Sequence, residues 1–188
     1  MIDKFVPYKY FKSIYDIDYK TLKKSGIKCL IFDLSNTLEP ENIQTPGRKV
    51  KDLFEDLKEM GFKLVIMSNK FKKEVTPFKE LLCVDSCYLS FKPLKRKYKK
   101  VMRTYGLIDT EIACIGDQLF FDVYGANRME FTSILVNPIS ADQFAVAKLN
   151  RKLENLVIKK LTKKDLFKRG RYYKENLLWM WSKVTNDR

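Results

Sequence analysis

The sequence predicts an α/β fold in which helices cover both faces of a central parallel sheet. Short runs of Ile, Leu, Val and Phe recur along the chain, and continuous apolar runs of this length are typical of strands that are buried on both faces. Amphipathic stretches with helical spacing separate these runs. The alternation of strand and helix favours parallel strands that are joined by crossover helices.

Five apolar runs are the predicted strands, and two amphipathic stretches between them are the predicted helices. The strands are expected at residues 28–33, 63–68, 86–91, 112–117 and 132–136. The helices are expected at 47–60 and 95–105, and each is followed by a glycine, Gly61 or Gly106, that ends it. Ligands of such sheets bind at the carboxyl ends of the strands. The polar residues that end these runs are therefore candidate site residues.

The composition excludes several kinds of catalytic and metal site. The 188 residues contain no histidine, whereas Ser-His-Asp and Cys-His catalysis, Cys₂His₂ zinc sites and two-His metal sites all need an imidazole. Residues 1–11 lack the apolar run of a secretory leader, so the four cysteines predict free thiols in a reducing compartment. No apolar run approaches the ~18 residues of a membrane span. We therefore expect a cytoplasmic protein without a transmembrane segment.

The chain is basic, and its charge is concentrated toward the carboxyl terminus. Lys and Arg number 37 against 23 Asp and Glu, which gives a net charge of +14. Residues 140–188 carry a net charge of +8, and two helices are expected there, at 141–161 and 172–184. These helices either present a solvated face to water or bind anionic phospholipid at the inner face of a membrane. Nucleic acid is a weaker candidate partner, because no motif that reads RNA or DNA is present.

Four polar motifs follow four successive predicted strands. They are Asp33-Leu34-Ser35-Asn36-Thr37, Ser68-Asn69, Lys92-Pro93 and GDQLFFD at 116–122, which contains Asp117 and Asp122. The motifs lie 35, 24 and 25 residues apart, about one strand-helix unit each. In this order they resemble the haloacid dehalogenase-like (HAD) phosphatases, whose pattern begins with a strand and DxDxT. The segments FKSIYDID, GIKCLIFDL and ILVNPI resemble the YqeG-type branch of subfamily IIIA, which is related to mitochondrial phosphatidylglycerophosphate phosphatases.

The resemblance implies a three-layer, Rossmann-like HAD fold and a division of the chain. We expect a phosphatase core with an N-terminal extension at 1–139, and a basic helical extension at 140–188 that packs on the core. Only short segments separate Asp33 from Ser68 and Ser68 from Lys92, which leaves no room for a large cap domain. Such an open site suits a phosphate carried on something large, such as the lipid phosphatidylglycerophosphate or a macromolecule.

The resemblance also implies a Mg²⁺-dependent phosphatase that forms an aspartyl-phosphate intermediate on Asp33. The implied metal ligands are Asp33, Asp117, Asp122 and the backbone carbonyl of Ser35. The implied catalytic residues are Asp33, Ser35 and Lys92, and the implied substrate-binding residues are Thr37, Ser68 and Asn69. Each of these residues also has a simpler interpretation, as a strand-end turn, a helix cap or a solvated lysine.

Ser35 departs from the family pattern. HAD phosphatases have an aspartate at this position, which protonates the leaving group and later deprotonates the attacking water. A serine hydroxyl is no comparable acid or base near neutral pH, and general acid-base catalysis contributes about 10²–10⁴-fold. We therefore expect slow hydrolysis of alkyl phosphates. The alternative hypothesis is a catalytically weak or inactive HAD-fold binding module.

Overall fold

The computed structural model describes residues 2–140 and 145–173. It contains a six-stranded sheet with the order β1-β6-β5-β2-β3-β4, in which every neighbouring pair is parallel. The strands are β1 (Lys9–Phe11), β2 (Cys29–Phe32), β3 (Lys63–Met67), β4 (Asp85–Cys87), β5 (Ile112–Gly116) and β6 (Thr132–Val136). The central strand β2 pairs with β3 on one side and with β5 on the other, so that Cys29 lies opposite Lys63 and Ile112.

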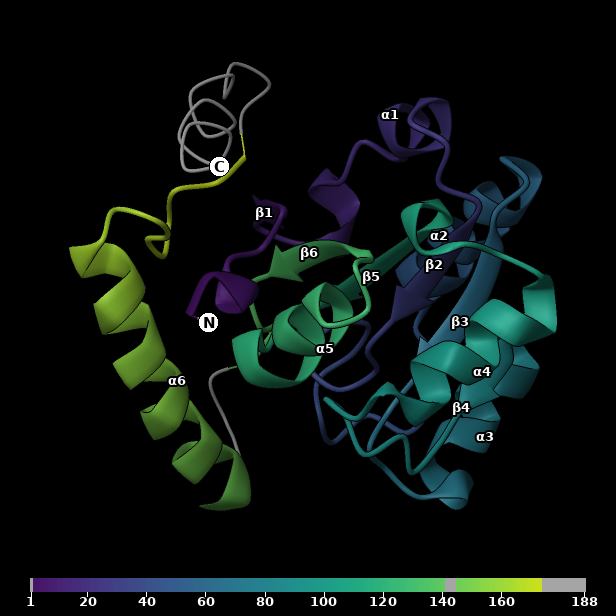
Figure 1. The fold of residues 1–188 in the computed structure, drawn as a ribbon. Helices are drawn as coiled ribbons and strands as arrows, with labels where there is room; N and C mark the ends of the chain where they lie inside the picture. Colours follow the sequence, from purple (N-terminus) through teal and green to yellow (C-terminus); the bar gives the residue numbers. More distant parts are fainter. Residues whose placement is uncertain (1, 141–144, 174–188) are drawn as a thin grey trace.

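Helices cover both faces of this sheet (Figure 1). They are α1 (Tyr19–Lys24), α2 (Arg48–Glu59), α3 (Lys72–Leu81), α4 (Lys95–Tyr105), α5 (Tyr124–Asn127) and α6 (Ala145–Lys163). Short 3₁₀ turns lie at Ile2–Phe5 (η1), Ile14–Asp16 (η2) and Asp109–Glu111 (η3), and a π-helical turn, η4, spans Leu119–Val123. Within residues 2–140 and 145–173, no helix has both the length and the apolar character that crossing a bilayer requires.

Alternate residues of β2 contribute to two separate cores. Leu30 and Phe32 pack with residues of α1, α2 and α3, and the ring of Phe32 lies 5.0 Å from that of Phe54. Cys29 and Ile31 pack on the other face, with residues of α4 and α5. When successive side chains of a strand enter opposite cores, every position is buried and the sequence of the strand is a continuous apolar run. The predicted three-layer α/β architecture is therefore confirmed.

Several element boundaries differ from the prediction. The strand expected at 86–91 is only Asp85–Cys87, because the chain then turns through left-handed backbone at Leu89 (φ 42°) and Phe91 (φ 52°). Four elements, β1, α1, α3 and α5, were not predicted from the sequence. The helix expected at 141–161 is α6, Ala145–Lys163, with 141–144 outside the described residues. The helix expected at 172–184 is not helical at 172–173, and its other residues lie outside the described part.

The described part of the C-terminal extension packs beside β1 and η4. Leu161 and Phe167 are buried in a third apolar cluster, which also contains Tyr10 of β1 and Leu119 of η4. Glu154 of α6 is buried, and its carboxylate accepts a hydrogen bond from the backbone N–H of Phe120 at 3.3 Å. The extension therefore contacts the turn that follows β5, where two of the predicted site residues lie.

Candidate active site

Asp33 lies at the carboxyl end of β2, where the strand leaves the sheet. Its backbone N–H still donates to the Ile115 carbonyl at 2.9 Å, so pairing with β5 fixes the position of its backbone. The chain then turns at Asn36, whose φ is 59° and whose N–H donates to the Glu39 carbonyl at 2.7 Å. Asparagine tolerates this left-handed conformation better than most residues. The turn leaves the Asp33 carboxylate at the edge of the sheet, 7% exposed.

Ser68 and Lys92 come from the ends of the next two strands. Ser68 follows β3 and is buried, and its N–H donates to the Cys87 carbonyl at 2.9 Å. The Asn69 side chain holds the backbone of Lys92: its Oδ1 accepts from the Lys92 N–H at 2.7 Å, and its Nδ2 donates to the Lys92 carbonyl at 3.4 Å. Oδ1 also lies 2.9 Å from the Ser90 hydroxyl. Asn69 therefore positions the lysine loop, a role that the motif did not indicate.

Three buried carboxylates converge beside Lys92. Asp117 follows β5 directly, Asp122 lies within η4, and each offers an oxygen within 4.8 Å of one from the other and from Asp33. The Lys92 ammonium contacts Asp33 Oδ1 and donates to Asp122 Oδ1 at 2.7 Å. Thr37 Oγ1 lies 3.4 Å from Asp33 Oδ2 and 3.5 Å from Asp117 Oδ1. The structure therefore brings five of the predicted site residues into one polar cluster.

Burial and neighbouring charge act in opposite directions on these groups. Burial tends to lower the pKa of Lys92, but the carboxylates of Asp122 and Asp33 outweigh it and raise that pKa above its usual value. Lys92 is therefore cationic at neutral pH. Burial raises the pKa of Asp122 above its usual value, while Lys92 opposes this rise and Asp33 adds to it. Burial acts on both pKa values through the same physical cause, because a group removed from water loses the solvation of its charged form.

Gly116, the last residue of β5, makes room for Asp122. A Cβ at position 116 would lie 2.2 Å from Asp122 Cγ. We expect Gly116→Ala to displace this carboxylate and to lower the free energy of unfolding by about 1–3 kcal/mol, the usual cost of overpacking. Urea denaturation measures the change. Gly47→Ala is the matched control, because its methyl group would meet only the flexible end of Glu39, at 3.0 Å. Equal losses in both variants would contradict the expected role of Gly116.

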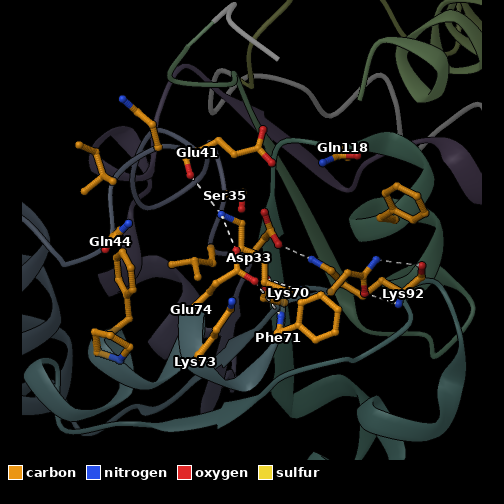
Figure 2. Close-up of a pocket in the computed structure, with 18 residues that line it drawn as sticks. Asp33, Ser35, Glu41, Gln44, Lys70, Phe71, Lys73, Glu74, Lys92 and Gln118 are labelled. Carbon is orange, nitrogen blue, oxygen red and sulfur yellow. Dashed lines mark hydrogen bonds and ion pairs between the residues drawn. The ribbon is translucent and has the colours of Figure 1, made fainter. Parts of the chain in front are cut away.

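A cavity of about 930 Å³ opens above this cluster at the carboxyl edge of the sheet. Figure 2 shows Asp33 and Lys92 with the cavity walls around them. Ser35 and Ser68 line the same cavity, together with Asp33, Asn69 and Lys92. Thr37, Asp117 and Asp122 lie outside its lining and form the buried part of the polar cluster.

Two further walls of the cavity come from segments that were not singled out in the sequence. They are the loop 41–44 after β2, and residues of α3 and of the segment before it. The Lys70 ammonium donates to the Glu41 carbonyl at 3.1 Å and joins the two walls. Irregular loops have no hydrophobic period, so the sequence did not indicate that these residues line a cavity.

Comparisons with known proteins agree with this geometry. A family model described as haloacid dehalogenase-like hydrolase matches residues 41–129. The probable phosphatase YqeG of Bacillus subtilis is 32% identical over 160 residues, which cover 85% of this chain and 93% of that protein. Phosphatidylglycerophosphate phosphatase 1, chloroplastic/mitochondrial, of Arabidopsis thaliana is 25% identical over 175 residues, which cover 86% of this chain and 49% of that protein.

A solved structure shows the same fold. The cobalt-bound form of the deoxy-D-mannose-octulosonate 8-phosphate phosphatase of Haemophilus influenzae superposes with a TM-score of 0.51 at 15% identity, over 79% of this chain and 97% of that one. The match to YqeG and the family model confirm the family that the four motifs indicated. The chain belongs to the haloacid dehalogenase-like hydrolases and is similar to the YqeG phosphatase over most of its length.

Proposed function

We propose that this HAD-family phosphatase hydrolyses phosphate monoesters through an aspartyl-phosphate on Asp33 and requires a divalent cation, Mg²⁺. The observation that carries the proposal is the convergence of three buried carboxylates and a buried lysine beneath an open cavity. A dianionic phosphate cannot approach a carboxylate closely unless its charge is compensated, and both a cation and Lys92 would provide this compensation.

The residues present fit a divalent cation. Asp33, Asp117 and Asp122 are hard oxygen donors, the ligand type that Mg²⁺ prefers. Together with Lys92 they form a buried group of three carboxylates and one ammonium, so a charge of +2 would balance the group if all four are ionised. We propose these carboxylates and the Ser35 carbonyl as the ligands. When bound, the cation would neutralise charge on the phosphate oxygens.

The side chains of this chain support a two-step reaction. In the first step, an oxygen of Asp33 attacks phosphorus, the bond from phosphorus to the ester oxygen breaks, and that oxygen leaves with the electron pair and takes a proton from solvent. In the second step, water attacks the same phosphorus and loses a proton to solvent, and the bond from phosphorus to the Asp33 oxygen breaks. This releases inorganic phosphate and restores the Asp33 carboxylate. Lys92 and the Ser68 hydroxyl would stabilise the phosphoryl oxygens in both steps.

Mg²⁺ should stabilise the folded chain. At a concentration 100 times its dissociation constant, a ligand adds about 2.7 kcal/mol of stability, which corresponds to roughly 5–10 °C in Tm for a domain of this size. Differential scanning calorimetry with and without Mg²⁺ measures this rise. Asp117→Asn should abolish it, whereas Asp109→Asn, a half-buried position in η3 before β5, should retain it. A Tm rise that survives in both Asp33→Asn and Asp117→Asn would contradict the proposed ligands.

We further propose that the phosphate belongs to a large molecule, and that a lipid phosphate such as phosphatidylglycerophosphate is the leading candidate. The segments between β2 and β3 and between β3 and β4 contain only α2 and α3, so neither provides a cap over the cavity. A protein in the cytoplasm that contacts the inner face of a membrane would meet such a substrate. Phosphate release from phosphatidylglycerophosphate in micelles, compared with release from glycerol 3-phosphate, tests this preference.

A binding module without turnover is the second candidate, and Ser35 is the observation that favours it. Such a module would still bind phosphate and Mg²⁺ through the residues of the cluster. A chain that binds both, but releases no more phosphate from p-nitrophenyl phosphate than its Asp33→Asn variant does, would be assigned to this second candidate.

A further inference from the structure

Exposed apolar side chains lie on loops at the carboxyl edge of the sheet, where the cavity opens. Four of them lie on the segments that follow the carboxyl ends of β2, β3 and β4, and we name these four residues the apolar rim. They are Ile43 (41% exposed), Phe71 (62%), Phe91 (62%) and Leu94 (56%). Ile43 and Phe71 also line the cavity itself. Large apolar groups that gather at one edge of a fold mark an interaction site more often than scattered ones do.

The backbone of the lysine loop holds Phe91 away from the core. Ser90 and Lys92, its two neighbours, are buried, and Ser90 is bonded to the Ser68 carbonyl through both its N–H, at 3.0 Å, and its hydroxyl, at 2.7 Å. Phe91 itself has a φ of 52°, a conformation that bulky residues rarely adopt. Strain of this kind persists where the surrounding structure enforces it, and it is concentrated at functional sites. The exposure of Phe91 is therefore built into the loop that carries Lys92.

Basic side chains flank the apolar rim. Lys72 and Lys73 follow Phe71 at the start of α3, and Lys95 and Arg96 follow Leu94 at the start of α4, and all four are exposed. The acidic residue nearest to them in the chain, Glu74, is half-buried, lies 3.6 Å from the Lys70 ammonium and accepts a hydrogen bond from the Phe71 N–H. The charge beside Phe71 and Leu94 is therefore mainly positive, whereas the half-buried Glu41 lies near Ile43 in the third loop.

We propose that the apolar rim docks on an anionic lipid surface, with the cavity opening toward the headgroups. Apolar side chains that enter the boundary between headgroups and acyl chains, flanked by lysines that meet anionic phosphates, are the usual means of interfacial binding. The rim residues lie on three separate loops, and basic residues lie between them in the chain. A fluid lipid surface can adapt to apolar groups spaced in this way better than a flat protein surface can. The idea that this contact delivers a lipid phosphate to Asp33 rests on the proposed function, whereas docking itself needs no catalysis.

Two rim positions allow a test that does not endanger the fold. Phe71 and Leu94 are the N-cap residues of α3 and α4, and serine is a preferred residue at this position. Phe71→Ser would also complete a capping box with Glu74. We therefore expect the double variant Phe71→Ser/Leu94→Ser to keep its Tm. The control Leu81→Ser/Ile108→Ser removes apolar side chains that are 50% and 60% exposed at the carboxyl end of α3 and just beyond that of α4.

Cosedimentation with vesicles of phosphatidylcholine and phosphatidylglycerol, compared with pure phosphatidylcholine, measures docking. We expect binding to the anionic vesicles, a loss of at least about tenfold in the rim variant, and no loss in the control variant. Phe91→Asn, at a backbone conformation that asparagine tolerates, should weaken binding independently. Asp33→Asn should bind vesicles as the unsubstituted chain does, so failure of docking and failure of catalysis are separate results.

Four outcomes would overturn the proposal. Negligible binding to anionic vesicles at low salt would remove the lipid surface. Equal losses in the rim and control variants would show that the position of the apolar groups does not matter. If instead substitution of Lys163, Lys164 and Lys168 by glutamine abolished binding while the rim variant retained it, the basic C-terminal extension would be the docking element. A rim variant that changes only self-association, measured by analytical ultracentrifugation, would assign this surface to a second copy of the chain and would overturn the lipid proposal as well.

Discussion

Replacement of Asp33 by asparagine should reduce phosphate release by at least about 10³-fold, because an amide oxygen is a far weaker nucleophile toward phosphorus than a carboxylate. The substitution is close to isosteric, and the amide oxygen can still accept a hydrogen bond from the Lys92 ammonium, which contacts Asp33 Oδ1. The backbone of residue 33 is fixed by its pairing with Ile115, and this pairing does not depend on the side chain. The loss should therefore reflect chemistry, and not a displaced loop.

The assay is steady-state release of p-nitrophenol from p-nitrophenyl phosphate in the presence of Mg²⁺. Asp109→Asn is the control, since this residue of η3 precedes β5 and so lies away from the carboxyl edge of the sheet. Its activity should equal that of the unsubstituted chain. If Asp33→Asn retained most of the activity, the nucleophile would have to be another group, and the aspartyl-phosphate mechanism would be wrong for this protein.

The central strands could be predicted from the sequence because a strand that is buried on both faces has a continuous apolar run. β2, β3, β5 and β6 lie within one residue of the expected bounds at each end. β1 and β4 are three-residue strands at the two edges of the sheet. Three residues are too few to show a hydrophobic period. The conformation of these two strands depends on hydrogen bonding to a single neighbouring strand and not on an apolar pattern. The helix α3, with Pro77 inside it, also lacks the clear helical signals of α2.

The site was predictable in part for the same reason. Asp33, Ser68 and Asp117 each follow a buried strand directly, so a parallel sheet must place them at one edge. The roles of Asn69 and Gly116 could not be predicted, because each depends on a contact with a residue of another segment or turn. Asn69 holds the backbone of Lys92, and Gly116 accommodates the side chain of Asp122. Such contacts exist only after the loops have folded against one another.

Ser35→Asp should increase the hydrolysis of alkyl phosphates by about 10²–10⁴-fold, because it supplies a group that can donate a proton to the leaving oxygen and later accept one from water. Ser35 is half-buried and lines the cavity, so a longer side chain can extend into open space without displacing the core. Glycerol 3-phosphate is a suitable alkyl substrate, since its leaving group must be protonated. Inorganic phosphate release with Mg²⁺ present measures the change.

Two comparisons separate proton transfer from a simple effect of size. Ser35→Asn introduces a side chain of nearly the same shape that cannot donate a proton as an acid, so it should leave the rate unchanged. p-Nitrophenyl phosphate has a leaving group that departs as a stable anion, so its gain from Ser35→Asp should be much smaller than that of glycerol 3-phosphate. Equal gains for both substrates, or equal rates for the Asp and Asn variants, would exclude proton transfer as the missing function. The double variant Asp33→Asn/Ser35→Asp should be inactive, because the restored acid acts on an ester bond that only the Asp33 carboxylate can attack.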